Sequence, residues 1–239
     1  MLHIDYSGLN ATPAMIVKFL EDNVVMPTAE INVARNPGQP EYLEFREVDF
    51  PKGRMGGTAS ATDCRVLALG RSAHSDPNKA LLSYVCEYSE GAARFVALGK
   101  GAGFCFTCTM NGCTFGIGSK APDGTVLVAH ANAKGQFSGA VDAFEKRVGR
   151  GISQVERSEL QSAHQVSMLT GAYASLGFQG SVGFLDPGAY RGGGVCNATT
   201  VGYRCGNEWN FAFQSLRTSS GVTSIVGVFP VVTNAVRIG

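Results

Sequence analysis

The sequence predicts one α+β domain, spanning residues 1–239, with strands in the centre and helices on the faces. Short runs of β-branched and aromatic residues recur between Gly, Pro and Asn-Gly turn signals, which is typical of strands. Four segments carry the caps or the apolar periodicity of helices. The chain has no internal repeat and no low-complexity linker that would divide it into separate units.

The first expected element is a helix over residues 12–24. Thr12 can cap this helix, Pro13 suits its first position, and an apolar stripe follows at helical spacing. Residues 28–50 are rich in Pro, Gly and Glu and contain only short strand-like pieces. The sequence therefore predicts a helix followed by a largely irregular stretch.

The next part of the chain predicts a loop, a strand and a second helix. Residues 51–63 have the composition of a loop, and residues 64–71 have that of a strand. A helix is expected over residues 75–91, with Ser75 or Asp76 as its cap, Pro77 early in it and Gly91 at its end.

Strands and tight turns fill the centre of the chain. Asn111-Gly112 is a turn signal, and SKAPDG over residues 119–124 is another. The runs between these signals are apolar, aromatic or β-branched. They predict strands over residues 92–100, 103–110, 113–118 and 125–131.

The C-terminal part predicts two helices, Gly-rich loops and closing strands. An amphipathic helix is expected over residues 137–148, ended by Gly149, and a longer helix over residues 153–176. Residues 177–194 are Gly-rich and are expected to form loops. Closing strands are expected over residues 209–216, 222–229 and 232–239, with Trp209 at a strand start in the core or in contact with a target.

Composition excludes several classes of function. The net charge of +1 and the lack of a basic run interleaved with aromatic residues argue against a nucleic-acid partner. No apolar run reaches about 18 residues, so no membrane span is expected. The N-terminus lacks a basic segment followed by an apolar one, so a Sec signal peptide is not expected and export would need another route.

The chain holds seven cysteines, an odd number that leaves at least one unpaired within the chain. Cys196 and Cys205 flank NATTVGYR and either close a hairpin-like loop as a disulfide or remain buried thiols. Three more cysteines, Cys105, Cys108 and Cys113, cluster around the Asn-Gly turn, and His130 follows 17 positions after the last of them.

Four interpretations of the stretch from Phe106 to His130 remain open on residue types alone. Cys105, Cys108, Cys113 and His130 are possible zinc ligands, although one C-x-x-C pair is weak support for a structural site. Two of the cysteines could form a disulfide. All could be small core residues around a satisfied histidine. Finally, Cys113 could be a nucleophile with His130 as its base.

The nucleophile hypothesis assigns a role to each residue around the turn. Gly112 lets the chain turn sharply and lets a substrate approach Cys113, while amides at the turn and at Thr114 could hold an oxyanion. His130 lies on the next strand, where antiparallel pairing can return it to the turn. An imidazolium there would lower the pKa of the thiol. Thr107 is a candidate to orient the imidazole.

These residues resemble the Burkholderia lethal factor family of glutamine deamidases, within the wider cytotoxic necrotizing factor and CheD group. That family has a Thr six residues before the Cys, in a Thr-x-x-Leu-Ser-Gly-Cys-like arrangement, and a His at the end of the next strand. Thr107, Met110-Asn111-Gly112-Cys113 and His130 match this order over about 25 residues. Asn111 replaces the Ser, the Cys-to-His spacing is longer, and residues 177–204 have no identified counterpart.

The resemblance implies a central β-sandwich of mostly antiparallel strands flanked by helices, acting without a cofactor or metal. It implies a toxin or effector that converts a glutamine of a host protein to glutamate through a Cys113 thioester, with His130 as base and Thr107 as its orienting partner. Such a protein is cytoplasmic before export and reaches the host cytosol by a non-Sec route. The alternatives are another Cys-His acyl-transfer enzyme, transglutaminase-like or peptidase, or a non-catalytic β-rich binding protein.

Overall fold

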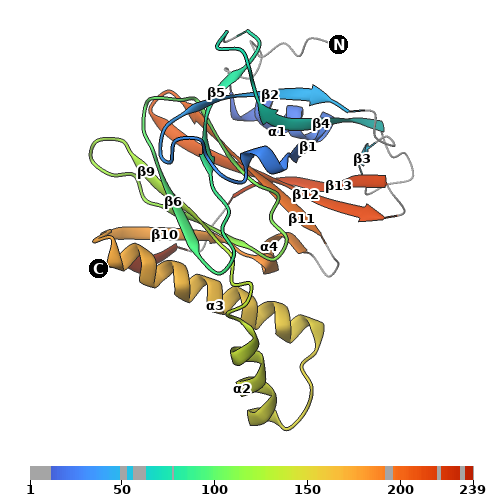
Figure 1. Ribbon diagram of the computed structural model, residues 1–239, viewed down its shortest axis with the longest axis vertical. Helices are drawn as coiled ribbons and strands as arrows, with labels where there is room; N and C mark the ends of the chain where they lie inside the picture. Colours follow the sequence, from blue (N-terminus) through green and yellow to red (C-terminus); the bar gives the residue numbers. More distant parts are fainter. Residues whose placement is uncertain are drawn as a thin grey trace.

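A computed structural model of the chain describes residues 12–48, 53–55, 63–76, 78–191, 196–219, 222–231 and 235–238. Two β-sheets form the centre, and helices cover their outer faces, so the predicted α+β class with a flanked β-sandwich is confirmed (Figure 1). No helix within the described ranges is long and apolar enough to cross a membrane.

Within the described residues the larger sheet has nine strands, and it bends far enough for its last strand to pair with its second. Most neighbours are antiparallel, but β1–β4, β5–β7 and β13–β3 are parallel. Because β3 also pairs with β4, the sheet closes on itself. Its order is β1 (Asn23–Pro27), β4 (Asp63–Arg71), β2 (Glu41–Glu47), β5 (Leu81–Cys86), β7 (Phe104–Thr107), β11 (Asn197–Cys205), β12 (Glu208–Ser219), β13 (Val222–Pro230) and β3 (Gly53–Met55).

The smaller sheet is antiparallel throughout. The predicted hairpin at its centre is confirmed, with a turn in which Gly124 has a positive φ of 87°. The order of the strands is β14 (Ala235–Ile238), β10 (Gly180–Leu185), β8 (Thr114–Gly118), β9 (Val126–Ala131) and β6 (Ala93–Leu98).

A continuous apolar layer joins the two sheets. Tyr84, Cys105 and Phe213 come from the larger sheet, while Phe115 and Val128 come from the smaller one, and all belong to one buried cluster. Each strand alternates between this layer and its opposite face, so Phe104 and Phe106 point the other way, into a second cluster. The sandwich core therefore lies between two further apolar layers that helices cover.

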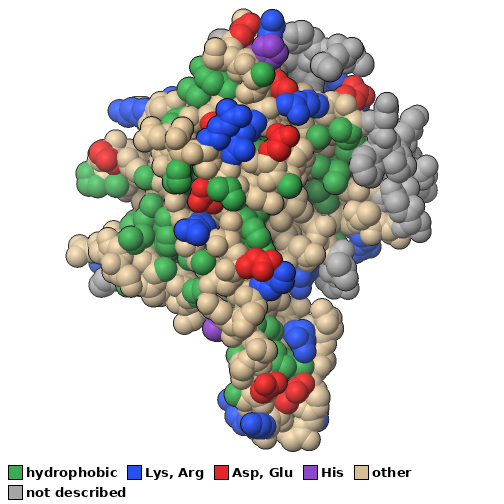
Figure 2. Space-filling view, in the orientation of Figure 1, with side chains coloured by type: hydrophobic (Ala, Val, Ile, Leu, Met, Phe, Trp, Pro, Cys, Tyr) green, Lys and Arg blue, Asp and Glu red, His purple; other side chains and the backbone are tan. Residues whose placement is uncertain are grey.

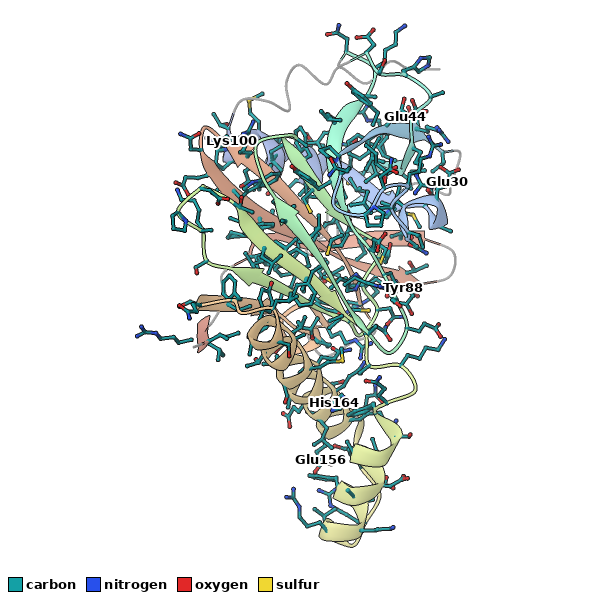
Figure 3. All side chains as sticks on the ribbon, turned by 60° about the vertical axis from the view of Figure 1, so that its left-hand side comes forward. Glu30, Glu44, Tyr88, Lys100, Glu156 and His164 are labelled. Atoms are coloured by element: carbon teal, nitrogen blue, oxygen red, sulfur yellow. The ribbon has the colours of Figure 1, made fainter. Side chains whose placement is uncertain are left out.

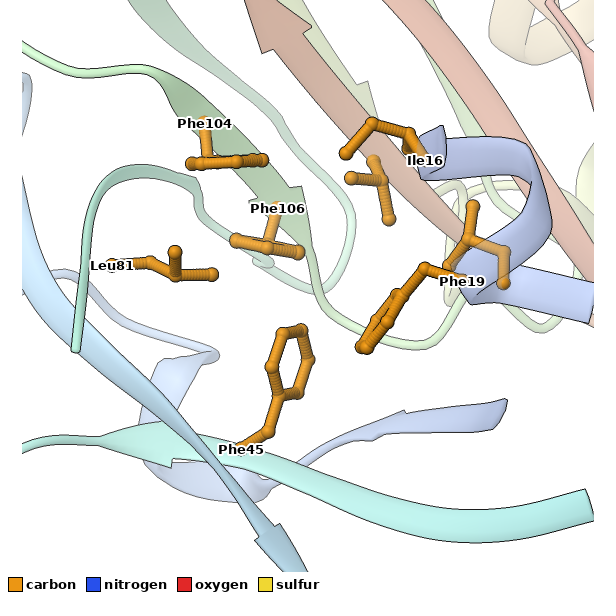
Figure 4. Close-up of a pocket in the computed structure, with 8 residues that line it drawn as sticks. Ile16, Phe19, Phe45, Leu81, Phe104 and Phe106 are labelled. Carbon is orange, nitrogen blue, oxygen red and sulfur yellow. The ribbon is translucent and has the colours of Figure 1, made fainter. Parts of the chain in front are cut away.

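Helix α1 (Pro13–Asp22) covers the larger sheet. The predicted cap is present, since the Thr12 side chain accepts from the Met15 amide, and Ile16 and Leu20 are buried. The short 3-10 helix η2 (Ala29–Ile31) follows. A gap of about 10 Å³ remains between α1 and the sheet, lined only by apolar side chains (Figure 4). Without polar partners so small a gap stays dry, so it is a packing defect and not a ligand site.

Two further helices follow the hairpin, as predicted. Helix α3 (Gln154–Ser175) starts with a Ser153–Glu156 capping box and packs Leu169 and Tyr173 on the smaller sheet. Helix α2 (Ser138–Val148) ends at Gly149 and projects away from both sheets (Figure 1). On the face drawn in Figure 2, basic and acidic side chains are interspersed.

The helix predicted over residues 75–91 is wrong. The segment holds strand β5 instead, whose residues are almost all buried because they pack between α1 on one side and the smaller sheet on the other. A strand buried on both faces is a continuous apolar run, and periodicity alone does not separate it from a helix. The cap-like residues before Leu81 form a turn, with the Ala80 amide bonded to the Asp76 carbonyl.

Two predicted loops also contain regular structure. Residues 177–194 hold β10 and a short helix α4 (Pro187–Arg191), because β8 and β14 pair with β10 on its two sides. The stretch 51–63 holds β3, although most of that stretch lies outside the described residues. In contrast, the strand predicted over 103–110 is shorter and ends at Thr107, after which Met110 bridges to Ala198.

The possible Cys196–Cys205 disulfide is absent, and both are thiols. The intervening residues form the single strand β11 and not a hairpin. At about 3.3 Å per residue the two ends of this strand lie roughly 25–30 Å apart, several times the span of a disulfide.

We expect Phe106→Ala to lower the free energy of unfolding by about 3–5 kcal/mol, because it removes a fully buried ring. Phe106 is 1% exposed and lies edge-on to Phe45 and stacked on Phe104. Phe229→Ala, at a ring that is 44% exposed, is the matched control. In urea unfolding it should lower the free energy of unfolding by less than half as much as Phe106→Ala. Equal losses would contradict the assignment of the core.

Candidate active site

The turn between β7 and β8 carries the chain from the larger sheet to the smaller one. Gly112 sits in this turn with a positive φ of 79°. A Cβ at this position would lie 2.7 Å from Arg191 Nη2 and 2.9 Å from Gln161 Nε2. The positive φ therefore favours glycine here, and a larger residue would also displace the ends of these two side chains from the turn. The turn leaves Cys113 at the first position after it, at the edge of the smaller sheet.

Tyr190 holds this turn from α4. Its hydroxyl accepts from the Gly112 amide at 2.9 Å and donates to the Cys113 carbonyl at 2.9 Å. The hydroxyl is buried, which raises the pKa of Tyr190, so it stays protonated and keeps both bonds. The Arg191 side chain adds a 3.0 Å bond to the Asn111 side-chain oxygen.

Two glutamines hold the same turn from α3. The side-chain amides of Gln161 and Gln165 donate to the Gly112 carbonyl at 2.6 and 2.8 Å. Gln165 also accepts from the Thr114 hydroxyl at 2.7 Å. Thus the amide and the carbonyl of Gly112 are both engaged, and the Thr114 hydroxyl is engaged as well. The backbone around Cys113 is fixed from two helices at once.

Cys113 is 2% exposed, and its thiol has polar neighbours. The Asn132 side-chain amide donates to Sγ at 3.1 Å. Burial raises the pKa of the Cys113 thiol, while the Asn132 amide, the Asn111 backbone amide and the charge of Arg191 each act to lower it. The balance is a raised pKa, so the resting side chain is a thiol surrounded by groups that favour the thiolate.

His130 lies on β9 and is 1% exposed. Its Nδ1 lies 3.5 Å from Cys108 Sγ, and its ring is 5.8 Å from that of Tyr88, centroid to centroid. The buried Nε2 has no hydrogen-bond partner among the described residues. Burial lowers the pKa of His130 to about 4, so the imidazole is neutral at neutral pH. The expected resting imidazolium beside the thiol is therefore not what this environment favours.

The sheet register brings Cys113 and His130 to the same face. Thr114 pairs with Ala131 and Phe115 with His130, so Cys113 lies opposite Asn132, two residues beyond His130. Side chains two apart on a strand share a face. Among the side-chain contacts of the described residues, however, the His130 ring meets Cys108 Sγ, and Cys113 Sγ meets the Asn132 amide.

Thr107 forms its hydrogen bond with β11 and not with the residues around Cys113. It is buried at the end of β7, and its hydroxyl accepts from the Thr200 amide at 3.3 Å. None of the recorded hydrogen bonds in the described part of the chain joins Thr107 to His130. The structure therefore brings Cys113 and His130 to one face, and it ties Thr107 to β11 instead.

A cavity of about 310 Å³ opens beside the two cysteines. Polar groups on its wall include the side chains of Asn32, Tyr88 and Asn111. Its lining is Pro27, Ala29, Asn32, Tyr88, Cys108, Thr109, Asn111, Cys113 and Asn132. Both thiols therefore have access to the same space, at the border of the two sheets.

The zinc interpretation has no support in the geometry. Cys105 points into the core between the sheets, whereas Cys108 lines the cavity. Within the described ranges no group of three or more His, Cys, Asp or Glu side chains is arranged to hold a metal ion. No disulfide joins any of the three cysteines.

The sequence did not predict Asn132 or Tyr190, and it placed Cys108 with His130 only as a possible zinc ligand. Asn132 was detectable, because it follows His130 by two positions and alternation puts it on the same face. Cys108 follows a strand whose end was misplaced, which concealed its contact with His130. Tyr190 lies in the segment predicted as a loop, and no local signal connects it with Gly112.

No protein-family model matches the chain, and no curated protein sequence matches it.

We predict that His130 makes the fold sensitive to acid. An unfolded histidine titrates near pH 6.5, whereas folded His130 takes up a proton only near pH 4. Between these values the unfolded state binds more protons, so the unfolding free energy should fall as the pH falls, by about 3 kcal/mol in total. Urea unfolding across this range measures the slope.

His130→Asn should lose this part of the pH dependence, since the buried group no longer titrates. His74→Gln is the matched control, because His74 is an exposed histidine, and it should keep the wild-type slope. An unchanged slope in His130→Asn would show that the imidazole is not buried in its neutral form.

Proposed function

We propose that the protein is a cysteine-dependent protein-glutamine deamidase, with Cys113 as nucleophile and His130 as general base. The observation that carries this proposal is the Cys113 thiol in the cavity wall, with the Asn132 amide 3.1 Å from Sγ and His130 on the same face of β9. The Thr107, Cys113 and His130 motif resembles that of deamidases in sequence. The protein substrate and the delivery to a host cell rest on that resemblance alone.

Cys113 is a better nucleophile than Cys108, although both line the cavity. Burial, together with the nearby Cys113, raises the pKa of Cys108 to about 12. The Cys113 sulfur instead faces the Asn132 amide, the Asn111 amide and the Arg191 charge, which stabilise a thiolate. We assign Cys108 the role of a neighbour that orients the imidazole through Nδ1, leaving Nε2 for proton transfer.

The first half-reaction starts from a thiol and a neutral imidazole. As a glutamine carboxamide enters the cavity, His130 Nε2 takes the Cys113 proton and Sγ attacks the carboxamide carbon. The negative charge moves to the carboxamide oxygen, and we assign the Asn132 side-chain amide, which already contacts Sγ, as the donor to it. The Gly112 amide is bound to Tyr190, so it positions the turn and does not supply an oxyanion donor.

The first half-reaction ends when the His130 imidazolium gives its proton to the leaving nitrogen, so ammonia departs and a Cys113 thioester remains. The second half-reaction restores the enzyme. Neutral His130 then takes a proton from water, and the hydroxide attacks the thioester carbon. Collapse expels the Cys113 thiolate, which regains the proton, and the product is a glutamate side chain. The low pKa of His130 suits this cycle, because the base is unprotonated at the start of each half.

The size of the cavity favours a single side chain as its occupant. A volume of about 310 Å³ stands at the small end of the range for ligand sites, which is about 300–1,000 Å³. The cavity lies where the ends of three elements meet, with Ala29 from η2, Tyr88 after β5 and Cys113 before β8. A glutamine carried on a protein loop can reach such a site, while its backbone stays outside.

The direct test is mass spectrometry of a host-cell lysate treated with wild-type protein. We expect ammonia release and conversion of one or a few glutamines to glutamate, both abolished by Cys113→Ser. Cys205→Ser is the matched control, since Cys205 lies outside the cavity, and it should keep full activity. Loss of activity in Cys108→Ser with full retention in Cys113→Ser would reassign the nucleophile.

Thiol reactivity tests the environment of Cys113 without a known substrate. At neutral pH, Asn132→Leu should slow iodoacetamide labelling of Cys113 by about tenfold, because a hydrogen bond to a charged group contributes about 1.5–3 kcal/mol. Labelling of Cys205 in the same sample is the internal control. Faster labelling of Cys113 in Asn132→Leu would mean that Asn132 shields the sulfur and does not activate it.

A further inference from the structure

A second cavity lies at the other end of the β8–β9 hairpin. Its volume is about 210 Å³, and three separate turns form its wall. Lys100 follows β6, Lys120 lies in the β8–β9 turn, and Arg204 lies where β11 turns into β12. In Figure 3 the labelled Lys100 lies well apart from Tyr88, which lines the cavity beside Cys113.

The charge of this second cavity is positive. Lys100, Lys120 and Arg204 face a single lining carboxylate, Asp123, and Lys120 is paired with Glu208. The Asp123 carboxylate accepts from the Thr125 amide, and Lys100 helps to lower its pKa. The side chain of Arg204 forms no ion pair or hydrogen bond with any described residue. Converging cations with fewer anions create a local field that attracts negative charge.

The ring of Trp209 forms an apolar part of the wall. The ring is fixed, with Phe211 6.4 Å and Tyr84 6.2 Å away between ring centroids. Its indole Nε1 is buried behind this surface and has no partner in the described part of the protein. The demand on a ligand therefore comes from the positive side chains of the wall, which call for negative charge.

We propose that this cavity docks a carboxylate side chain from an acidic segment of the protein substrate, and this rests on the proposed function. Its volume is below that of ordinary cofactor sites, so it suits one anionic group. Pro122 and the indole of Trp209 give the wall an apolar part that the stem of a Glu or Asp side chain can cover. A free ion would leave that part of the wall uncovered.

The two cavities set a distance between the docked acid and the target glutamine. Cys113 and Lys120 are seven positions apart along the β8 side of the hairpin, which corresponds to roughly 20 Å at strand spacing. An extended segment needs about six residues to cover that distance. The acidic docking segment is therefore a separate feature of the substrate, remote from the glutamine that is modified.

The experiment uses the fluorescence of Trp209, the only tryptophan of the chain. The probe is a tryptophan-free acetylated Gly-Glu-Gly-Glu-Gly amide, titrated into the full-length protein at low ionic strength. We expect a saturable change in emission that weakens with added salt. Lys100→Gln and Arg204→Gln should each weaken the binding at least tenfold, while Lys18→Gln, an exposed lysine on α1, should leave it unchanged.

Two further titrations decide which kind of anion the cavity binds. A peptide with Gln in place of Glu should give no change, and inorganic phosphate at the same concentration should not displace the acidic peptide. Equal binding of the Gln peptide, full displacement by phosphate, or an unaltered affinity in Lys100→Gln would each overturn the proposal.

Cys113→Ser should bind the acidic peptide as wild type does, because its substitution lies at the other cavity. An absence of peptide binding together with deamidation would therefore refute the docking site alone. Peptide binding without deamidation in any lysate would refute the proposed function alone.

Discussion

The crossing from β7 to β8 is the constraint on which the site depends. At that point the chain leaves the closed nine-stranded sheet and enters the five-stranded one, within a turn whose positive φ at Gly112 favours glycine. Tyr190 and two glutamines of α3 fix both polar groups of Gly112. Contacts with two helices thus fix the position of Cys113. The register of β8 with β9 then places His130 and Asn132 on the same face of the smaller sheet as Cys113.

Burial governs the chemistry that this position allows. It lowers the pKa of His130 to about 4 and raises the pKa of the Cys113 thiol, so both groups rest uncharged. A resting thiolate–imidazolium pair would have to pay for two buried charges, and the environment does not offset that cost. In the proposed reaction, the polar neighbours of Sγ stabilise the charge that develops during attack. An uncharged resting state would then be combined with donors that act in the transition state.

Local patterns predicted much of the fold and part of the site. The capped helices and the β8–β9 hairpin follow from residues close in sequence. Strand β5 could not be predicted in this way, because a strand buried on both faces has the same apolar pattern as a buried helix. Strand β10 could not be predicted either, because its neighbours in the sheet are remote in sequence. At the site, Cys113 and His130 follow from spacing, whereas the Cys108 contact and the Tyr190 clamp arise from tertiary packing.

The two cavities lie at opposite ends of one hairpin, and we propose chemistry at Cys113 in one and recognition near Trp209 in the other. The proposed chemistry requires that Cys113 attack a glutamine-like carbonyl. A short peptide carrying a chloroketone in place of the glutamine carboxamide tests this most directly, since attack leaves a stable thioether that peptide mapping locates. We predict an adduct on Cys113 that His130→Asn prevents. An adduct on Cys108, or equal labelling of all accessible thiols, would contradict the claim.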